Sequence, residues 1–219
     1  MEKFCRNHTL RFLFTFHFSL FTLSLLISTT SPAVTSAHVL DEFLTGLETY
    51  SAAFEQQLYD DTGMELEKSV GVFYMRRPGM FHWAYLEPYS QIIISDSITL
   101  WIYDEDLEQV SIKTITNQID ESPAAILGGD VKIEEHYVVV EQEAEGDIKW
   151  LELTPRDLES QYETIRLGFN QDHLMKMVLF DNLGQKNLIT FLDTKRNTTL
   201  NLELFSFTPP EGVDVIDNR

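Results

Sequence analysis

The stretch "YMRRPGMFHWAYLEPY", from Tyr74 to Tyr89, places an aromatic residue at every second position after an arginine pair and a Pro-Gly turn. Successive side chains of a β-strand point to opposite faces, so Phe81, Trp83 and Tyr85 share one face of an extended strand. Such a face usually fills a core, because aromatic rings dominate core packing. The alternative is that the rings line a cavity. The choice depends on what the rest of the chain can place over them.

Turn residues divide most of the chain beyond Gly63 into short apolar runs that we expect to be strands. The expected strands are Val70–Arg76, Met80–Leu86, Gln91–Ser95, Thr99–Tyr103, Glu108–Lys113, Val131–Val140, Ile148–Leu153, Thr164–Phe169, Leu174–Phe180, Asn187–Asp193 and Thr199–Phe207. Many short strands at spacings of about 8–12 residues are typical of an antiparallel barrel or sandwich. No long helical pattern alternates with them, so a doubly wound α/β fold is disfavoured.

Two segments have helical patterns. His38–Asp60 reads as one amphipathic helix, because its apolar residues recur at spacings of three and four. These apolar residues are Leu40, Phe43, Leu44, Leu47, Tyr50, Phe54 and Leu58. In Glu121–Asp130, Ser122 as N-cap and Pro123 at the first helical position predict a helix of about one and a half turns. So short a helix needs a packing partner. It is either a lid or plug over a cavity or an ordinary connection that covers a sheet edge.

The first 37 residues have the pattern of a secretory signal peptide. A basic start precedes the apolar run Phe12–Ile27, and small residues follow as far as Ala37. We expect cleavage after Ala37, with Ala33 as the second choice, and a single domain over residues 38–219. The alternative, an uncleaved membrane anchor, is disfavoured because the run is short for a spanning helix and contains His17.

Charge and motif content narrow the function. The 219 residues include 35 Asp and Glu against 16 Lys and Arg, so the formal net charge is −19. Such a surface repels nucleic acid and anionic lipid headgroups, and we interpret it as a solvated acidic coat rather than a dedicated docking surface. The one cysteine, Cys5, lies in the expected signal peptide, and the histidines lack metal-ligand spacing. Without a nucleophile or phosphate-binding motif, we expect neither catalysis nor a cofactor or metal.

Several expected strands, such as "QIIIS", "LMKMVLF" and "LITFL", are apolar on both faces. A sheet of this kind must be covered twice or must enclose something. The two expected helices can cover only part of it. A curved sheet with helices on its concave face would leave an apolar cavity, as small barrels do for hydrophobic ligands. The sequence therefore favours the cavity interpretation of the aromatic face.

At this point the residues resemble a known family, the periplasmic outer-membrane lipoprotein carrier proteins, or LolA family. The resemblance rests on "RRPGMFHW" at 76–83, "SDSITLWIYDEDLEQV" at 95–110 and "FTPPEGV" at 207–213, in that family's order and spacing. It implies a mainly β fold: an open, incomplete antiparallel β-barrel, or half-barrel, closed by an N-terminal helix and short helices as a lid. Ser97 replaces the glycine of the family's Ser-Asp-Gly turn, which implies a left-handed backbone there or a different turn.

The resemblance also implies a function. Such carriers take triacylated lipoproteins from an ATP-driven release complex of the inner membrane and pass them to an outer-membrane receptor lipoprotein. The family's gating arginine corresponds to Arg77, which is expected to bond to the lid. We expect a monomer, with an acyl-chain cavity formed by the aromatic face and both helices. The expected cavity residues are Phe81, Trp83, Tyr85, Leu44, Leu47, Phe54, Trp101, Ile126 and Leu127.

Two other functions stay open. One is a lipid- or lipoprotein-sensing module of the same fold, in envelope signalling or glycolipid export, although such regulators usually add a second domain. The other is an enzyme that acts on lipids. This is the least favoured, because no nucleophile–base pair can be read from the sequence.

Overall fold

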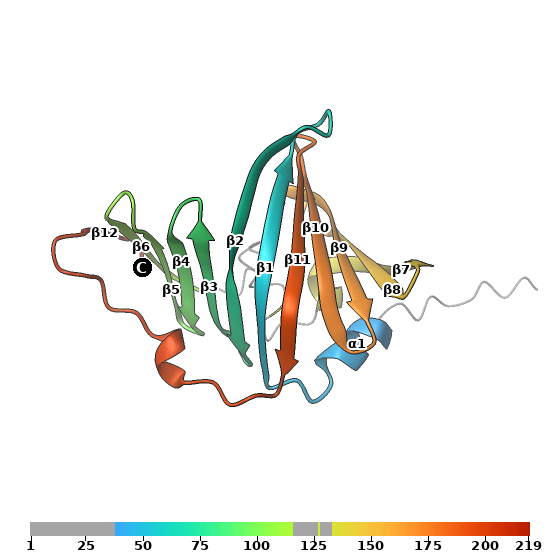
Figure 1. Ribbon diagram of the computed structural model, residues 1–219, viewed down its shortest axis with the longest axis horizontal. Helices are drawn as coiled ribbons and strands as arrows, with labels where there is room; N and C mark the ends of the chain where they lie inside the picture. Colours follow the sequence, from blue (N-terminus) through green and yellow to red (C-terminus); the bar gives the residue numbers. More distant parts are fainter. Residues whose placement is uncertain (1–37, 116–126, 128–132) are drawn as a thin grey trace, which may run out of the picture. The chain divides into compact units, whose positions relative to one another are not determined.

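The computed structural model describes residues 38–115, 127 and 133–219, and the expected signal peptide lies outside them. These residues form one 12-stranded sheet in the order β12-β6-β5-β4-β3-β2-β1-β11-β10-β9-β8-β7 (Figure 1). The strands are β1 (Thr49–Tyr59), β2 (Glu65–Arg76), β3 (Met80–Glu87), β4 (Gln91–Asp96), β5 (Thr99–Asp104), β6 (Gln109–Thr114), β7 (Tyr137–Glu145), β8 (Ile148–Pro155), β9 (Tyr162–Asn170), β10 (His173–Asp181), β11 (Lys186–Arg196) and β12 (Asp214–Asp217). Neighbours are antiparallel except β12 and β6, which are parallel. The expectation of a mainly β fold with an open sheet is confirmed, because the two ends of this order, β12 and β7, are not neighbours.

Helices in the described part of the chain are few and short. They are α1 (His38–Leu44), α3 (Ile133–His136) and the 3₁₀ helix η1 (Leu202–Phe205). Of the helix expected within Glu121–Asp130, only Leu127 belongs to the described residues, and it is helical. Among the described residues, no helix combines the length and the hydropathy needed to cross a membrane.

The expected helix over His38–Asp60 is wrong beyond Leu44. Gly46 has a φ of 64°, and Thr49–Tyr59 forms β1, which pairs with β2 on one side and β11 on the other. The apolar residues Tyr50, Phe54 and Leu58 are four apart, a spacing that fits one helix face and, being even, also fits one strand face. The segment forms a strand because it pairs with β2 and β11, and the spacing alone could not distinguish this from a helix.

The other differences lie near the chain segments with weak patterns. The strands expected between Val70 and Lys113 and between Ile148 and Asp193 are confirmed, with ends that differ by a few residues. The strand expected over Val131–Val140 was wrong in its first part, because α3 occupies Ile133–His136. The strand expected over Thr199–Phe207 was also wrong. Asn201 caps η1 there, and its side-chain oxygen accepts a hydrogen bond of 3.1 Å from the backbone of Glu203.

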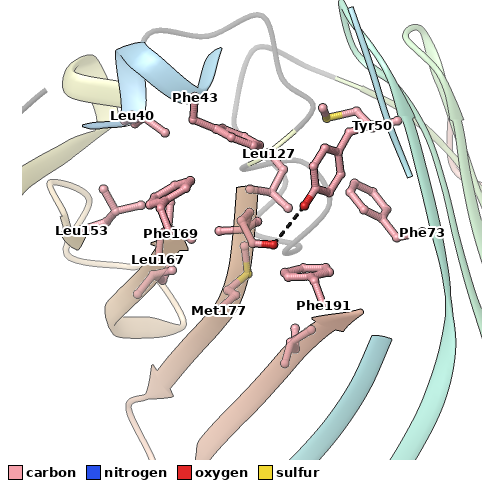
Figure 2. Close-up of a cluster of buried hydrophobic side chains, with 14 of the residues drawn as sticks. Leu40, Phe43, Tyr50, Phe73, Leu127, Leu153, Leu167, Phe169, Met177 and Phe191 are labelled. Carbon is pink, nitrogen blue, oxygen red and sulfur yellow. Dashed lines mark hydrogen bonds between the residues drawn. The ribbon is translucent and has the colours of Figure 1, made fainter. Parts of the chain in front are cut away.

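The face of the sheet that carries Phe54, Phe73, Trp83 and Phe191, here called the core face, holds the main hydrophobic cluster. Register aligns these residues, because Phe54 lies opposite Phe191 and Phe73 lies opposite Trp83. The cluster extends across β9 and β10 and includes residues of α1 (Figure 2). The hydroxyl of Tyr50 donates a hydrogen bond of 2.9 Å to the backbone carbonyl of Leu174. Strands on both sides of β1 therefore share one core.

The opposite face, here called the outer face, is covered over β3 to β6 by the C-terminal segment. His82 Nδ1 lies 2.8 Å from the carbonyl oxygen of Leu204 in η1, and the rings of Tyr103 and Phe207 are 5.4 Å apart. Phe205 is 2% exposed and lies outside the core-face cluster. β12 then adds a strand beside β6. From β3 to β5 the sheet is thus apolar on both faces, and the C-terminal segment covers the outer one.

The turn that departs from the family pattern has a left-handed backbone, one of the two alternatives expected for it. Ser97 has a φ of 83°. Its backbone N–H donates a hydrogen bond of 3.0 Å to the hydroxyl of Ser95, and Asp96 accepts bonds from the next two backbone N–H groups. These local hydrogen bonds offset the cost of a left-handed conformation at a residue other than glycine.

Gly71 of β2 gives a first prediction, on stability. A Cβ at this position would collide with the ring of Phe54 and with the carbonyl oxygen of Ala84. We expect Gly71→Ala to lower the free energy of unfolding by about 3 kcal/mol, because an overpacked core forces strain on its neighbours. Denaturation in urea measures this loss.

The control is Gly146→Ala, where an added Cβ meets nothing within 4 Å and the cost comes only from a φ of 62°. We expect a loss of about 1 kcal/mol for that left-handed backbone. Equal losses in the two variants would contradict the collision at Gly71.

His82 gives a second prediction, on pH. Burial lowers the pKa of His82 from its ordinary value of 6.5, and its hydrogen bond to Leu204 opposes this shift only in part. The unfolded state therefore binds more protons than the folded state as the pH falls. The contribution of neutral His82 to the free energy of unfolding is fully present above pH 6.5 and is lost as the pH drops below it.

Thermal unfolding between pH 5 and pH 8 should show a smaller pH dependence for His82→Gln than for the original protein. Because His136 and His173 are present in both proteins, the difference isolates His82. Identical slopes in the two proteins would show that His82 does not couple folding to pH.

Candidate functional site

The aromatic face expected from the sequence is present on β3. Phe81 and Trp83 are 3% and 2% exposed, and Tyr85 packs against the same cluster while partly exposed. The Trp83 ring lies 4.5 Å from that of Phe54 and 5.0 Å from that of Phe73. Strand alternation and register therefore bring the rings of β1, β2 and β3 into one continuous aromatic surface.

Two polar groups lie within this aromatic surface. The indole nitrogen of Trp83 is buried and has no hydrogen-bond partner within the described part of the chain. The Tyr85 hydroxyl donates a hydrogen bond of 2.9 Å to the side-chain oxygen of Gln56, and burial raises the pKa of Tyr85 to about 12. Both groups are uncharged near neutral pH, and the Tyr85 hydroxyl already donates its proton within the protein.

The cover over this surface comes from short segments rather than from more strands. Leu40 and Phe43 of α1 and Leu47 after it are buried in the cluster, and the Phe43 ring lies 5.1 Å from that of Phe169. Leu127 is 3% exposed and points into the same cluster near Phe43 and Tyr50 (Figure 2). The side chains of this cover meet the cluster by apolar contact. The backbone between α1 and β1 is also held by Asn197, whose amide nitrogen donates a hydrogen bond of 2.8 Å to the carbonyl oxygen of Gly46.

Most of the expected cavity residues lie in this one cluster. Phe81, Trp83, Tyr85, Phe54, Leu44, Leu47 and Leu127 belong to it or pack against it. Ile126 lies outside the described residues. Leu47 and Phe54 reach the cluster from a loop and a strand, not from the long helix that was expected.

Trp101 is the exception and has to be corrected. On β5 it lies opposite Ile94 and Ile112, and neither of these neighbours belongs to the core-face cluster. Trp101 therefore lies on the outer face. Its neighbours Leu100 and Ile102 are also apolar, so the sequence of β5 carries no alternation from which the correct face could be read.

Sequence reasoning missed the far half of the cluster. Phe169, Met177 and Phe191 are fully buried there, on β9, β10 and β11. Their strands were expected. β10 and β11 are apolar on both faces, so their patterns gave no assignment to one face. β9 does alternate between apolar and other residues from Thr164 to Phe169, a pattern that could have assigned Phe169 to the core face. A signal was present in Gly71, because a glycine inside a strand often marks a close approach, here by the Phe54 ring.

Arg77 lies in the turn between β2 and β3. Its backbone N–H donates a hydrogen bond of 2.9 Å to the carbonyl oxygen of Glu48, close to α1 in the chain. Its side chain is partly buried and lines a recess of about 380 Å³. The recess is lined by Glu48, Thr49, Arg76, Arg77, Asn197, Thr198, Thr199 and Leu200. The expected bond between Arg77 and a lid stays a prediction.

A metal centre has no support in the described ranges. Within residues 38–115, 127 and 133–219, no three His, Asp or Glu side chains gather closely enough to hold a metal ion. The chemistry available on the core face is apolar contact with a few uncharged donors and acceptors.

Comparison with known proteins places this arrangement in a known group. The family model "Outer membrane lipoprotein carrier protein LolA" matches residues 45–208. A solved structure of an uncharacterised conserved protein from Thermus thermophilus shares the fold, with a TM-score of 0.53 and 12% identity over 83% of this chain and 98% of the other.

Two curated relatives bear the name outer-membrane lipoprotein carrier protein. The one from Nitrosomonas europaea is 39% identical over 81% of this chain and 86% of its own length. The one from Nitrosospira multiformis is 38% identical over 91% of this chain and 96% of its own length. With a family match over most of its length and relatives of this identity, the chain belongs to the outer-membrane lipoprotein carrier protein (LolA) family.

Proposed function

We propose that this protein is a periplasmic carrier that binds the acyl chains of lipoproteins and delivers the lipoproteins towards the outer membrane. The names of its relatives support this function. The observation that carries it is the core-face cluster, which a non-closing sheet leaves to be covered by α1, Leu47 and Leu127. A cover of this kind can be displaced without breaking any strand pairing of the sheet.

The physical need for such a carrier follows from the size of the hydrophobic effect. Each buried CH₂ group contributes about 0.8 kcal/mol, so the chains of a triacylated lipoprotein in water carry a cost of tens of kcal/mol. An empty apolar hollow would be costly too. Side chains such as Phe43 and Leu127 that fill it in the absence of cargo remove this cost, and cargo binding then exchanges one set of apolar contacts for another.

The remaining parts of the proposal concern location and partners. We propose that residues 1–37 are a signal peptide removed after about Ala37, that residues 38–219 act as a monomeric domain, and that no catalytic step takes place. The donor is an ATP-driven lipoprotein release complex of the inner membrane, and the acceptor is a receptor lipoprotein of the outer membrane. The net charge of −19 supports a protein that stays off anionic membrane surfaces and does not bind nucleic acid.

The direct test is replacement of Phe81, the aromatic residue at the start of the core-face row on β3. Phe81→Ala should weaken binding of a fluorescent triacylated peptide about tenfold or more, because a ring that contacts the acyl chains is lost. Equilibrium titration of the purified protein measures the dissociation constant.

The matched control is Phe205→Ala, which removes an equally buried ring from the cover of the outer face. Each variant should lose about 3–5 kcal/mol of stability, since both delete a buried phenyl group. Only the core-face variant should lose affinity. If both variants bound the peptide as tightly as the original protein, the core face would not be the acyl-chain site.

A second test concerns Arg77, which we propose as the residue that bonds to the cover and favours the closed form. A hydrogen bond from a charged group contributes about 1.5–3 kcal/mol, so Arg77→Leu should shift the balance of closed and open forms about tenfold or more. The rate of cargo transfer to acceptor membranes should change, while the domain stays folded and loses at most about 3 kcal/mol of its free energy of unfolding.

Arg76→Leu is the control, because Arg76 precedes Arg77 in the chain, lines the same recess and is exposed. Its transfer rate should equal that of the original protein. Equal rates in both variants and the original protein would contradict the gating role.

A further inference from the structure

We infer that the core face ends in a subsite for the uncharged, hydrogen-bond-donating head of the cargo, namely the peptide amides next to the acylated residue. This subsite surrounds Asn187 and disfavours phosphate headgroups. The inference rests on the proposed function and deepens it, because it states how a carrier distinguishes a lipoprotein from a phospholipid that has the same acyl chains.

The core face changes from apolar to polar along its strands. Near the middle, Phe54 lies opposite Phe191 on β11. Two residues further along β1, on the same face, Gln56 lies opposite Ser69 of β2. Two residues beyond Gln56, Leu58 lies opposite Asn187 of β11. These positions adjoin the turns β1–β2 and β10–β11, at the end of the sheet opposite to α1 (Figure 1). An amphiphile with its chains on the aromatic surface would therefore place its head at this polar end.

A cavity of about 340 Å³ opens at this polar end. It is lined by Leu58, Gln161, Tyr162, Leu179, Asp181, Asn182, Leu183, Gln185 and Asn187. Leu179 is fully buried and belongs to the core-face cluster, and Tyr162 packs against that cluster. The apolar floor of the cavity is thus continuous with the proposed acyl-chain surface, while amide side chains form much of its rim.

Asn187 has hydrogen-bonding capacity that its protein neighbours do not use. Its side-chain oxygen is buried and has no partner within the described part of the chain. Other polar residues of the cavity hold the surrounding loops. Asn182 donates a hydrogen bond of 2.6 Å to the carbonyl oxygen of Ser160, and Asp181 accepts bonds from the backbone N–H groups of Leu183 and Gln185. A buried, unpaired amide oxygen is costly, so a ligand that donates a hydrogen bond to Asn187 gains stability.

The charges around this polar end favour a donor and oppose an anion. Asp181 lines the first cavity, and Glu67 and Asp104 line a second one of about 270 Å³ beside Gln56 and Tyr85. Neither set of lining residues contains Lys or Arg.

The lysines near this end interact with other groups. The Lys68 ammonium lies 3.0 Å from the Glu55 carboxylate, and the Lys186 ammonium lies over the Tyr59 ring. A phosphate would meet carboxylates here, whereas peptide N–H groups would meet acceptors.

The test compares Asn187→Leu with the original protein against three probes: a fluorescent triacylated cysteinyl peptide, a fluorescent fatty acid and phosphatidylglycerol as a competitor. We expect the peptide to bind about tenfold more weakly to the variant, because one hydrogen bond to the head is lost. Binding of the fatty acid should change less than twofold. Phosphatidylglycerol should compete better against the peptide in the variant than in the original protein.

Two further variants complete the design. Gln142→Leu makes the same kind of change from amide to alkyl on β7, away from both cavities, and should leave all three affinities unchanged. Asn187→Asp keeps the size and the acceptor, so it should retain the peptide and exclude phosphatidylglycerol more strongly, which also covers the case in which Asn187→Leu fails to fold.

Unchanged peptide affinity in Asn187→Leu, or an equal loss for peptide and fatty acid, would overturn the subsite. Loss of peptide binding in Asn187→Asp would overturn it as well. If the original protein bound neither acylated probe, the carrier function itself would fail, which is a distinguishable result.

Discussion

The antiparallel pairing of β1 with both β2 and β11 is the constraint on which the rest of this structure depends. Register along these ladders brings Phe54 opposite Gly71 on one side and opposite Phe191 on the other. The missing side chain at Gly71 leaves room for the Phe54 ring, which then contacts Trp83 of β3. A shift of β1 by one residue would turn Phe54 and the other core-face side chains of this strand to the outer face. One central strand therefore aligns the aromatic surface across both halves of the sheet.

An open sheet has an apolar face that must be covered by something other than its own strands. On the outer face of β3 to β6 the C-terminal segment meets this need, and it is held by η1, by the hydrogen bond at His82 and by the added strand β12. The core face differs, because its cover consists of α1 and single residues such as Leu47 and Leu127. The cover of the outer face is fastened by the backbone pairing of β12 with β6. The side chains that cover the core face meet it by apolar contact, which a ligand with acyl chains can replace, while Asn197 holds the backbone between α1 and β1 by hydrogen bonds.

The two ends of the core face carry different kinds of side chain. The end near α1 is apolar, with Leu40, Phe43 and Tyr50 packed together. The other end carries Gln56, Asn187 and carboxylates. An acylated peptide has the same division between chains and head. Apolar contact provides affinity without discrimination. The amides and carboxylates at one end provide discrimination, because peptide N–H groups meet acceptors there and a phosphate meets like charge.

The sequence by itself determined the mainly β character, the positions of most strands and the shared face of Phe81, Trp83 and Tyr85, because alternation with period two is a local property. At Ser97 it left two alternatives, a left-handed backbone or a different turn, and the structure has the left-handed backbone. Only the tertiary structure decided that Thr49–Tyr59 is a strand and that Trp101 lies on the outer face. The four-residue spacing of Tyr50, Phe54 and Leu58 fits a helix and a strand equally, and β5 is apolar on both sides of its backbone. Such ambiguities are resolved by strand partners that are distant in the chain, so no local pattern contains the answer.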